Sequence, residues 1–232
     1  MKRLPTLLKL TLTISLLILM IAPAGAQGWR QGEMEIKVNL DDSKDARTLH
    51  ELGLNGDIYT KYALMYVTPS ELENVKSTGL DYEITKENLN EYYRDFWETR
   101  DQYHTYQEII DVMDSLADAL PGLVMKTVYG ESVGGRELSA LKISDNVEVD
   151  EPEAEIGFDG NIHGDEIGGG ENMIRFARWL CQQYNQNNPE IVELINNREI
   201  WIFPMVNPDG RVSLSRYNNN FVDLNRDWGY MW

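Results

Sequence analysis

The feature that most constrains the fold is a strand–helix–strand pattern between residues 155 and 206. Residues 155–161 and 199–206 are short runs rich in apolar residues, with the length of strands. Between them, residues 166–184 form a long segment whose apolar side chains recur at helical spacing. Strands that alternate with long helices are typical of a layered α/β sheet.

The same pattern extends upstream. Thr105 and Glu108 form a capping box that predicts the start of a helix, and a Pro-Gly pair predicts its end. Two further strands are predicted at residues 124–129 and 137–144. We therefore predict an α/β fold for residues 103–232, with a mixed central sheet flanked by helices.

Residues 27–86 look like a small α/β unit of their own. A unit of this size is marginal as an independent domain, so we expect it to dock on the second unit. Residues 87–102 are acidic and aromatic and are interpreted as a connector that packs on the second unit. Within the small unit, strands are predicted at residues 34–40, 62–67 and 81–85 and helices at residues 46–54 and 69–76.

Residues 1–26 have the features of a secretory signal peptide. A basic start precedes an apolar stretch over residues 10–21, and the small residues 24–26 form a cleavage site after Ala26. An uncleaved membrane anchor is the less favoured alternative, because the apolar stretch is short for a bilayer span. We expect a secreted or periplasmic protein with no membrane attachment after cleavage.

The composition excludes some partners. The full chain has 21 basic and 38 acidic residues, and the leader holds three of the basic ones and no acid. The remainder therefore carries 18 basic against 38 acidic residues, a net charge of −20, which disfavours binding to nucleic acid. The single cysteine, Cys181, cannot form an internal disulfide and is interpreted as a buried apolar residue. The sequence carries no signal for a particular oligomeric state.

His163 and Glu166 are candidate metal ligands. His163 follows a predicted strand and Glu166 lies at the start of the next helix, and side chains at this spacing can reach one point. An imidazole and a carboxylate are ligand types of a catalytic zinc. A lone His-x-x-Glu pattern is weak, because it arises by chance roughly a quarter of the time in such a chain. A histidine beside a helix-capping glutamate is the structural alternative.

Two further motifs strengthen this interpretation. Asn207-Pro-Asp-Gly210 predicts a turn after the last strand. Arg216 and then Asp223-Leu-Asn225-Arg226 supply an arginine fork suited to a carboxylate and an amide beside it, near a predicted sheet edge at residues 221–224. Taken singly, these residues would be interpreted as a turn and a solvated surface.

The three motifs in this order resemble those of the zinc metallocarboxypeptidases of the carboxypeptidase A superfamily. The resemblance covers residues 103–232, and the N-terminal unit resembles the small segments that precede many such domains. It implies peptide or protein C-termini as the substrate and Zn²⁺ as the cofactor. By this resemblance, His163 and Glu166 are zinc ligands, Arg216 stabilises the oxyanion, Asn225 and Arg226 bind the substrate carboxylate, and Asp223 orients the ligand histidine.

The family pattern also requires a third ligand histidine and a general-base glutamate downstream, which cannot be placed in this sequence. His50 and His104 precede the metal motif and receive no ligand role. We therefore interpret the chain as an incomplete carboxypeptidase domain, and we expect weak metal affinity and no turnover. Two alternatives stay open: a related zinc-dependent deacylase of N-acyl amino acids, and a non-catalytic carboxypeptidase-like binding module.

Overall fold

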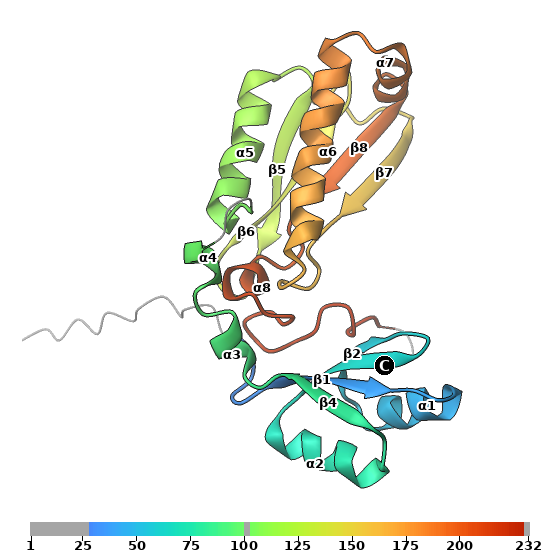
Figure 1. The fold of residues 1–232 in the computed structure, drawn as a ribbon. Coiled ribbons are helices and arrows are strands. Elements are labelled where there is room, and N and C mark those ends of the chain that lie inside the picture. The colour runs from blue at the N-terminus through green and yellow to red at the C-terminus, as the bar shows by residue number, and fades with distance from the viewer. Residues whose placement is uncertain (1–27, 100–102, 230–232) are drawn as a thin grey trace, which may run out of the picture.

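The computed structural model describes residues 28–99 and 103–229, which form two four-stranded sheets with separate apolar cores (Figure 1). The predicted leader lies outside the described residues. No helix in the described part of the chain has the length and apolar character needed to cross a bilayer.

The N-terminal unit, residues 28–86, is an antiparallel sheet in the order β2-β3-β1-β4 with two helices. Its core includes Ile36, Val38, Leu49 and Met65, contributed by strands and helix alike. Its elements are β1 (Met34–Asn39), α1 (Ser43–Glu51), β2 (Asn55–Ile58), β3 (Tyr62–Val67), α2 (Pro69–Thr78) and β4 (Tyr82–Lys86).

The helix predicted at residues 46–54 begins three residues earlier. Asp42 and Asp45 form a capping box that fixes its start. Gly53, at a φ of +66°, then leads the chain into β2. β2 is not predicted by its sequence, because Asn-Gly-Asp is more typical of a turn than of a strand.

The second unit, residues 103–229, contains a mixed sheet in the order β5-β6-β8-β7. Its elements are α5 (Tyr106–Ala119), β5 (Val124–Glu131), β6 (Glu137–Ile143), β7 (Ala154–Asp159), α6 (Ile167–Asn185), α7 (Pro189–Ile195), β8 (Arg198–Phe203) and α8 (Pro208–Ser213). Two short helices, α3 (Leu89–Tyr92) and α4 (Phe96–Thr99), lie in the segment that connects the two units.

The topology of this sheet confirms the predicted α/β class. β7 and β8 pair in parallel through the crossover helix α6, whereas β5, β6 and β8 pair antiparallel. α5 and α6 cover one face of the sheet, where Ile200 and Ile202 of β8 are buried. The helices expected at residues 166–184 and from Thr105 are present within a residue or two.

Two predictions for the end of the chain were wrong. Asn207-Pro-Asp-Gly does not stop at a turn but begins α8, where the Asn207 side chain accepts a hydrogen bond from the Gly210 amide. The stretch 221–224 is not a sheet edge: it forms no strand, and Phe221 adopts a φ of +58°. An alternating pattern of four residues was too short to separate a strand from a loop.

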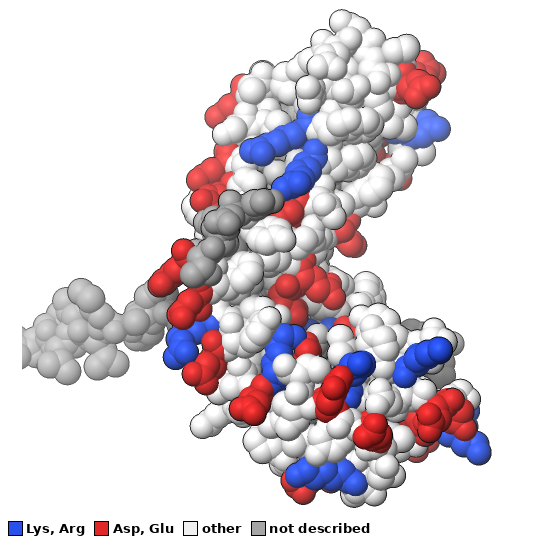
Figure 2. Space-filling view, viewed as in Figure 1, with Lys and Arg blue, Asp and Glu red and all other residues white. Residues whose placement is uncertain are grey.

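The two units are joined by a buried cluster of three aromatic residues, Trp29, Tyr66 and Tyr217, packed with Leu89, which is called the aromatic cluster below. The Trp29 indole donates to the Leu214 carbonyl at 2.7 Å. The segment after α8 runs between the two sheets (Figure 1). The N-terminal unit therefore docks on the second unit, as its small size led us to expect. On the face drawn in Figure 2, acidic and basic side chains are interspersed over the N-terminal unit.

Candidate active site

The two polar motifs meet because their strands are parallel neighbours. His163 lies four residues beyond the end of β7, and Asn207 lies four residues beyond the end of β8, at the same edge of the sheet. Backbone hydrogen bonds continue the ladder into both loops: the Val206 amide donates to the Gly160 carbonyl, and the Asn207 amide donates to the Asn161 carbonyl, both at 3.1 Å. The loops therefore have a fixed mutual position.

His163 is held between two carboxylates. Its Nδ1 atom lies 3.0 Å from Oε1 of Glu166, and its Nε2 atom lies 3.1 Å from Oδ1 of Asp223. The imidazole is buried, with 3% of the residue exposed, whereas Glu166 is exposed. One ring nitrogen therefore faces the second candidate ligand, and the other faces a buried carboxylate.

Arg216 extends this row of charges. Its Nε atom donates to Oδ2 of Asp223 at 2.6 Å, and its two terminal nitrogens donate to the two oxygens of Asp57 at 3.1 and 3.2 Å. The guanidinium also lies over the ring of Tyr66, 5.4 Å from its centroid. Arg216 is buried, so its charge is balanced by the two carboxylates.

Arg226 lies on the other side of Asp57. Its Nη2 atom donates to the Gly56 carbonyl at 2.8 Å and lies 3.7 Å from Oδ1 of Asp57. Asp57 belongs to β2 of the N-terminal unit, so two arginines of the second unit bind one carboxylate of the first. Arg216 and Arg226 thus form an arginine pair around one carboxylate of the same chain.

The close contacts shift the pKa values of these groups. Burial alone would lower the pKa of His163, but its hydrogen bonds to Asp223 and Glu166 outweigh burial and raise it to about 9. Burial would raise the pKa of Asp223, but its hydrogen bond with His163 and the charge of Arg216 lower it to about 2. A divalent cation would therefore displace a proton from His163 near neutral pH.

The structure brings together four of the six residues singled out from the sequence: His163, Glu166, Asp223 and Arg216 form one continuous chain of contacts. Arg226 joins them through Asp57. Asn225 is oriented by its neighbours, since its backbone amide donates to Oδ1 of Asp223 and its side-chain oxygen accepts from the indole of Trp228.

Two site residues were missed. Asp57 belongs to the N-terminal unit, and no local pattern marks it as a partner of Arg216. Asp165 lies between the two candidate ligands, and burial raises its pKa to about 6. Its place within the His163-Gly-Asp-Glu166 motif was the available signal.

The donor set fits part of a zinc site. Two ligands of one tetrahedral zinc, with bonds of about 2.1 Å, lie about 3.4 Å apart, and the His163 and Glu166 atoms are 3.0 Å apart. Among the described residues, no third His, Cys, Asp or Glu completes a three-ligand group at this point. His50 is exposed, and His104 contacts Glu171 instead.

Comparison with known families decides the assignment. The sequence model of one family, described as zinc carboxypeptidase, matches residues 109–232, more than half of the chain. The chain belongs to the zinc carboxypeptidase family. The match contains both ligand candidates and both arginines that contact Asp57.

Relatives and solved structures agree with this family. A zinc carboxypeptidase of Saccharothrix mutabilis subsp. capreolus is 38% identical over a match covering 56% of this chain and 33% of the relative. The catalytic chain of human carboxypeptidase N is 34% identical, covering 55% of this chain and 31% of the relative. The match therefore spans about a third of the length of these relatives.

The fold is similar to that of the solved carboxypeptidase A from Helicoverpa armigera. The TM-score is 0.60 at 20% sequence identity, and the match covers 87% of this chain and 54% of that one. The structure of thrombin-activatable fibrinolysis inhibitor gives a TM-score of 0.54 at 18% identity, covering 81% of this chain and 54% of the other. These matches extend the likeness in fold beyond the residues matched by the family.

Proposed function

We propose that this chain carries two of the zinc ligands and the substrate-binding residues of a secreted metallocarboxypeptidase, an enzyme that hydrolyses C-terminal amino acids from peptides. The observation that carries the proposal is the carboxylate held by Arg216 and Arg226 beside the His163–Glu166 pair. A peptide's C-terminal carboxylate has the same charge and geometry as the Asp57 side chain, so the same arginine forks suit it. Secretion rests on the predicted leader.

Each residue has a role in this reaction. His163 and Glu166 would hold the zinc, and Asp223 would accept a hydrogen bond from Nε2 of His163 and so direct Nδ1 toward the metal. Bound zinc supplies Lewis acidity and an activated water. Arg216 would stabilise the negative charge that develops on the scissile carbonyl oxygen. Arg226, with Asn225, would bind the terminal carboxylate and so confine hydrolysis to the last peptide bond.

The N-terminal unit would act as an inhibitory segment. Asp57 engages both Arg226, which the substrate carboxylate would need, and Arg216, which the scissile carbonyl would need, and the Gly56 carbonyl takes a further donor from Arg226. A peptide must displace this strand before its own carboxylate can bind. The N-terminal unit would therefore behave as a propeptide, and the connector at residues 87–102 would be the place where it is separated from the rest.

The test is peptide binding to the Asp57→Ala variant of the chain. We expect this variant to bind a blocked dipeptide with a free carboxylate more tightly than the unaltered chain does, and to discriminate against the corresponding amide. Adding Arg226→Ala to Asp57→Ala should remove about 1–2 kcal/mol of that binding, less than the loss of a fully buried charge pair, because Arg226 is half-buried. Glu73→Ala removes an exposed carboxylate of the same unit and is the matched control.

Equal binding of the free and amidated dipeptides by Asp57→Ala would refute the role given to the arginines. The alternatives are separated by a hydrolysis assay, run with Zn²⁺ on a version of the protein that also has a third ligand and a general base. A deacylase would hydrolyse N-acyl amino acids in preference to the dipeptide. A binding module would bind the dipeptide without zinc-dependent release of its last residue.

A further inference from the structure

A completely buried arginine lies beneath the loop that carries the candidate metal ligands. Arg211, on α8 directly after Asn207-Pro-Asp-Gly, has none of its surface exposed. One of its terminal nitrogens donates to Oε1 of Glu171 at 2.7 Å and also to the His104 carbonyl. Burying a guanidinium is costly unless it is paired. Glu171 compensates the charge of Arg211, but this pairing alone does not explain why an arginine is placed here.

The other terminal nitrogen of Arg211 points toward the ligand loop. It donates to Oδ1 of Asn161 at 3.0 Å and to the Ile167 carbonyl at 3.2 Å. The Asn161 amide in turn donates to the carbonyls of His163 and Gly164, at 2.7 and 3.1 Å. A continuous path of hydrogen bonds therefore runs from α8 to the backbone of the ligand His163 itself.

The backbone packing leaves this loop little freedom. A Cβ atom added to Gly164 would lie 1.8 Å from the carbonyl carbon of Gly210, and one added to Gly170 would lie 2.9 Å from a terminal nitrogen of Arg211. Asn161 itself adopts a φ of +60°, a region that asparagine tolerates better than most residues. The loop is pressed against α8, and its shape depends on the contacts made there.

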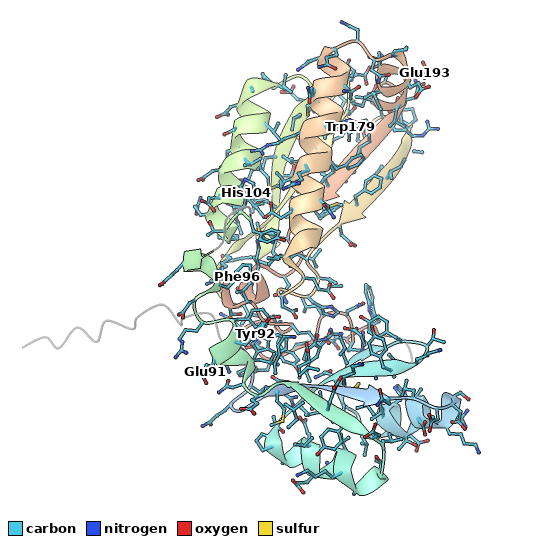
Figure 3. All side chains as sticks on the ribbon, viewed as in Figure 1. Glu91, Tyr92, Phe96, His104, Trp179 and Glu193 are labelled. Carbon is cyan, nitrogen blue, oxygen red and sulfur yellow. The ribbon has the colours of Figure 1, made fainter. Side chains whose placement is uncertain are left out.

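Glu171 anchors the arginine from the opposite side. Its two carboxylate oxygens accept from the backbone amide and Nδ1 of His104 at 2.7 and 2.8 Å, as well as from Arg211. Figure 3 shows His104 beside the first turn of α5, while Glu171 belongs to α6. The buried ion pair between Arg211 and Glu171 thus joins α8 to α6, and the contacts of Glu171 with His104 add a residue that lies just before the start of α5.

We propose that Arg211 and Asn161 are positioning residues for His163: they fix the backbone of residues 163–164 so that the imidazole meets Glu166 at the metal position. The proposal rests on the proposed function, in which His163 and Glu166 bind zinc. A hydrophobic side chain would fill the space of Arg211 without reaching the loop. The specific contribution of the arginine is the hydrogen bond to Asn161.

The experiment measures Zn²⁺ affinity by competition with a chromophoric chelator, together with the visible spectrum of bound Co²⁺, on the chain with both of its units. Arg211→Met removes the whole path, and Asn161→Gly removes only the amide while tolerating the positive φ. We expect both variants to bind Zn²⁺ about 10- to 100-fold more weakly, the usual range for groups behind a metal ligand. We also expect a changed Co²⁺ spectrum and an unchanged far-ultraviolet circular dichroism spectrum.

Two comparisons make the result decisive. Arg175→Met removes an exposed arginine of α6 and should leave metal affinity unchanged. Arg211→Lys keeps the charge but cannot reach Asn161 and Glu171 together, so it should fall between Arg211→Met and the unaltered chain. If Arg211→Met does not fold, Asn161→Gly tests the path alone.

Unaltered Zn²⁺ affinity and Co²⁺ spectrum in Asn161→Gly would overturn the positioning role, provided that His163→Ala loses the metal. Equal affinity of His163→Ala and the unaltered chain would overturn the metal site itself, and the positioning role with it. The two failures are thus separated by the His163→Ala measurement.

Discussion

At the scale of single residues, the candidate site is a row of side chains with alternating charges, in which Glu166, His163, Asp223 and Arg216 contact one another in turn. Arg216 neutralises Asp223, and Asp223 is thereby a strong acceptor for His163. With no charged partner, a buried imidazole would stay neutral, but here its contacts favour the protonated form. The same contacts fix which ring nitrogen faces Glu166, and this orientation is what a metal ligand requires.

Cys181 gives a test at the residue scale. It is 3% exposed on the inner face of α6, and burial raises the pKa of its thiol to about 11. Because the thiolate is the reactive form, we expect no reaction with a disulfide reagent at pH 8 in the folded chain and complete reaction in urea. Rapid labelling of the folded chain would contradict the burial of this face of α6.

At the scale of elements, parallel pairing of β7 and β8 is the decisive feature. It brings the ends of both strands to one edge, and the loops beyond them carry His163 and Asn207. α8 then turns the chain so that the Arg216 carbonyl accepts a hydrogen bond from the side-chain nitrogen Nδ2 of Asn207 at 3.3 Å. Short elements with side-chain caps therefore determine where the functional groups lie.

The pairing of β6 with β8 can be tested through pH. Lys142 and Glu199 form a buried ion pair at 2.7 Å, and the carboxylates of Asp150 and Glu155 lie close to Glu199. The hydrogen bond from Lys142 lowers the pKa of Glu199, so this pair stabilises the fold above the normal glutamate pKa of about 4.5 and loses that effect as the pH falls.

Lys142→Met should lower the free energy of unfolding by about 3 kcal/mol at pH 7, because it leaves a buried carboxylate without its partner. The difference from the unaltered chain should narrow as the pH falls below the normal glutamate pKa and through the lowered pKa of Glu199, where this carboxylate becomes neutral. Urea unfolding at several pH values measures this. A difference independent of pH would mean that the methionine substitution acts through packing and not through charge.

At the scale of the whole molecule, the buried aromatic cluster and the Asp57 carboxylate both join the two units. Trp29 contacts Tyr66, Tyr93 and Tyr217, with ring centroids 5.0 to 6.1 Å apart. The hydroxyl of Tyr217 donates to Glu33 at 2.8 Å. Asp57 is thus presented to Arg216 by an interface that also contacts the guanidinium, since Tyr66 of the cluster lies under Arg216.

Trp29→Ala tests this interface. Truncating a buried tryptophan typically costs about 3–5 kcal/mol. The free energy of unfolding measured in urea should therefore fall by this amount, or the unfolding curve should separate into two transitions, one for each unit. Trp179→Ala is the matched control, because Trp179 is 45% exposed on α6 and its loss should cost less than about 1 kcal/mol. Equal effects of the two substitutions would contradict the role of Trp29 as the anchor of the N-terminal unit.

Local chemistry made much of this molecule predictable. The Thr105–Glu108 capping box marked the start of α5, and helical periodicity marked α6 and the burial of Cys181. His163 and Glu166 are three residues apart after a strand, so their convergence follows from short-range geometry. By contrast, β2 and α8 were missed or misjudged: turn-forming residues occupy β2, where tertiary packing overrides their local preference, and in α8 Asn207 and Pro208 suit a helix start as well as a turn.

The class of fold, the two candidate metal ligands and the arginines suited to a carboxylate could all be identified from the amino-acid sequence, since each depends on contacts within a few residues or on a local pattern. The partner that those arginines bind became apparent only in the folded chain. Asp57 and Arg216 are 159 positions apart, and no periodicity links them. Their contact exists because the aromatic cluster docks one unit on the other, and the shape of a packed interface is not encoded in any local stretch of chain.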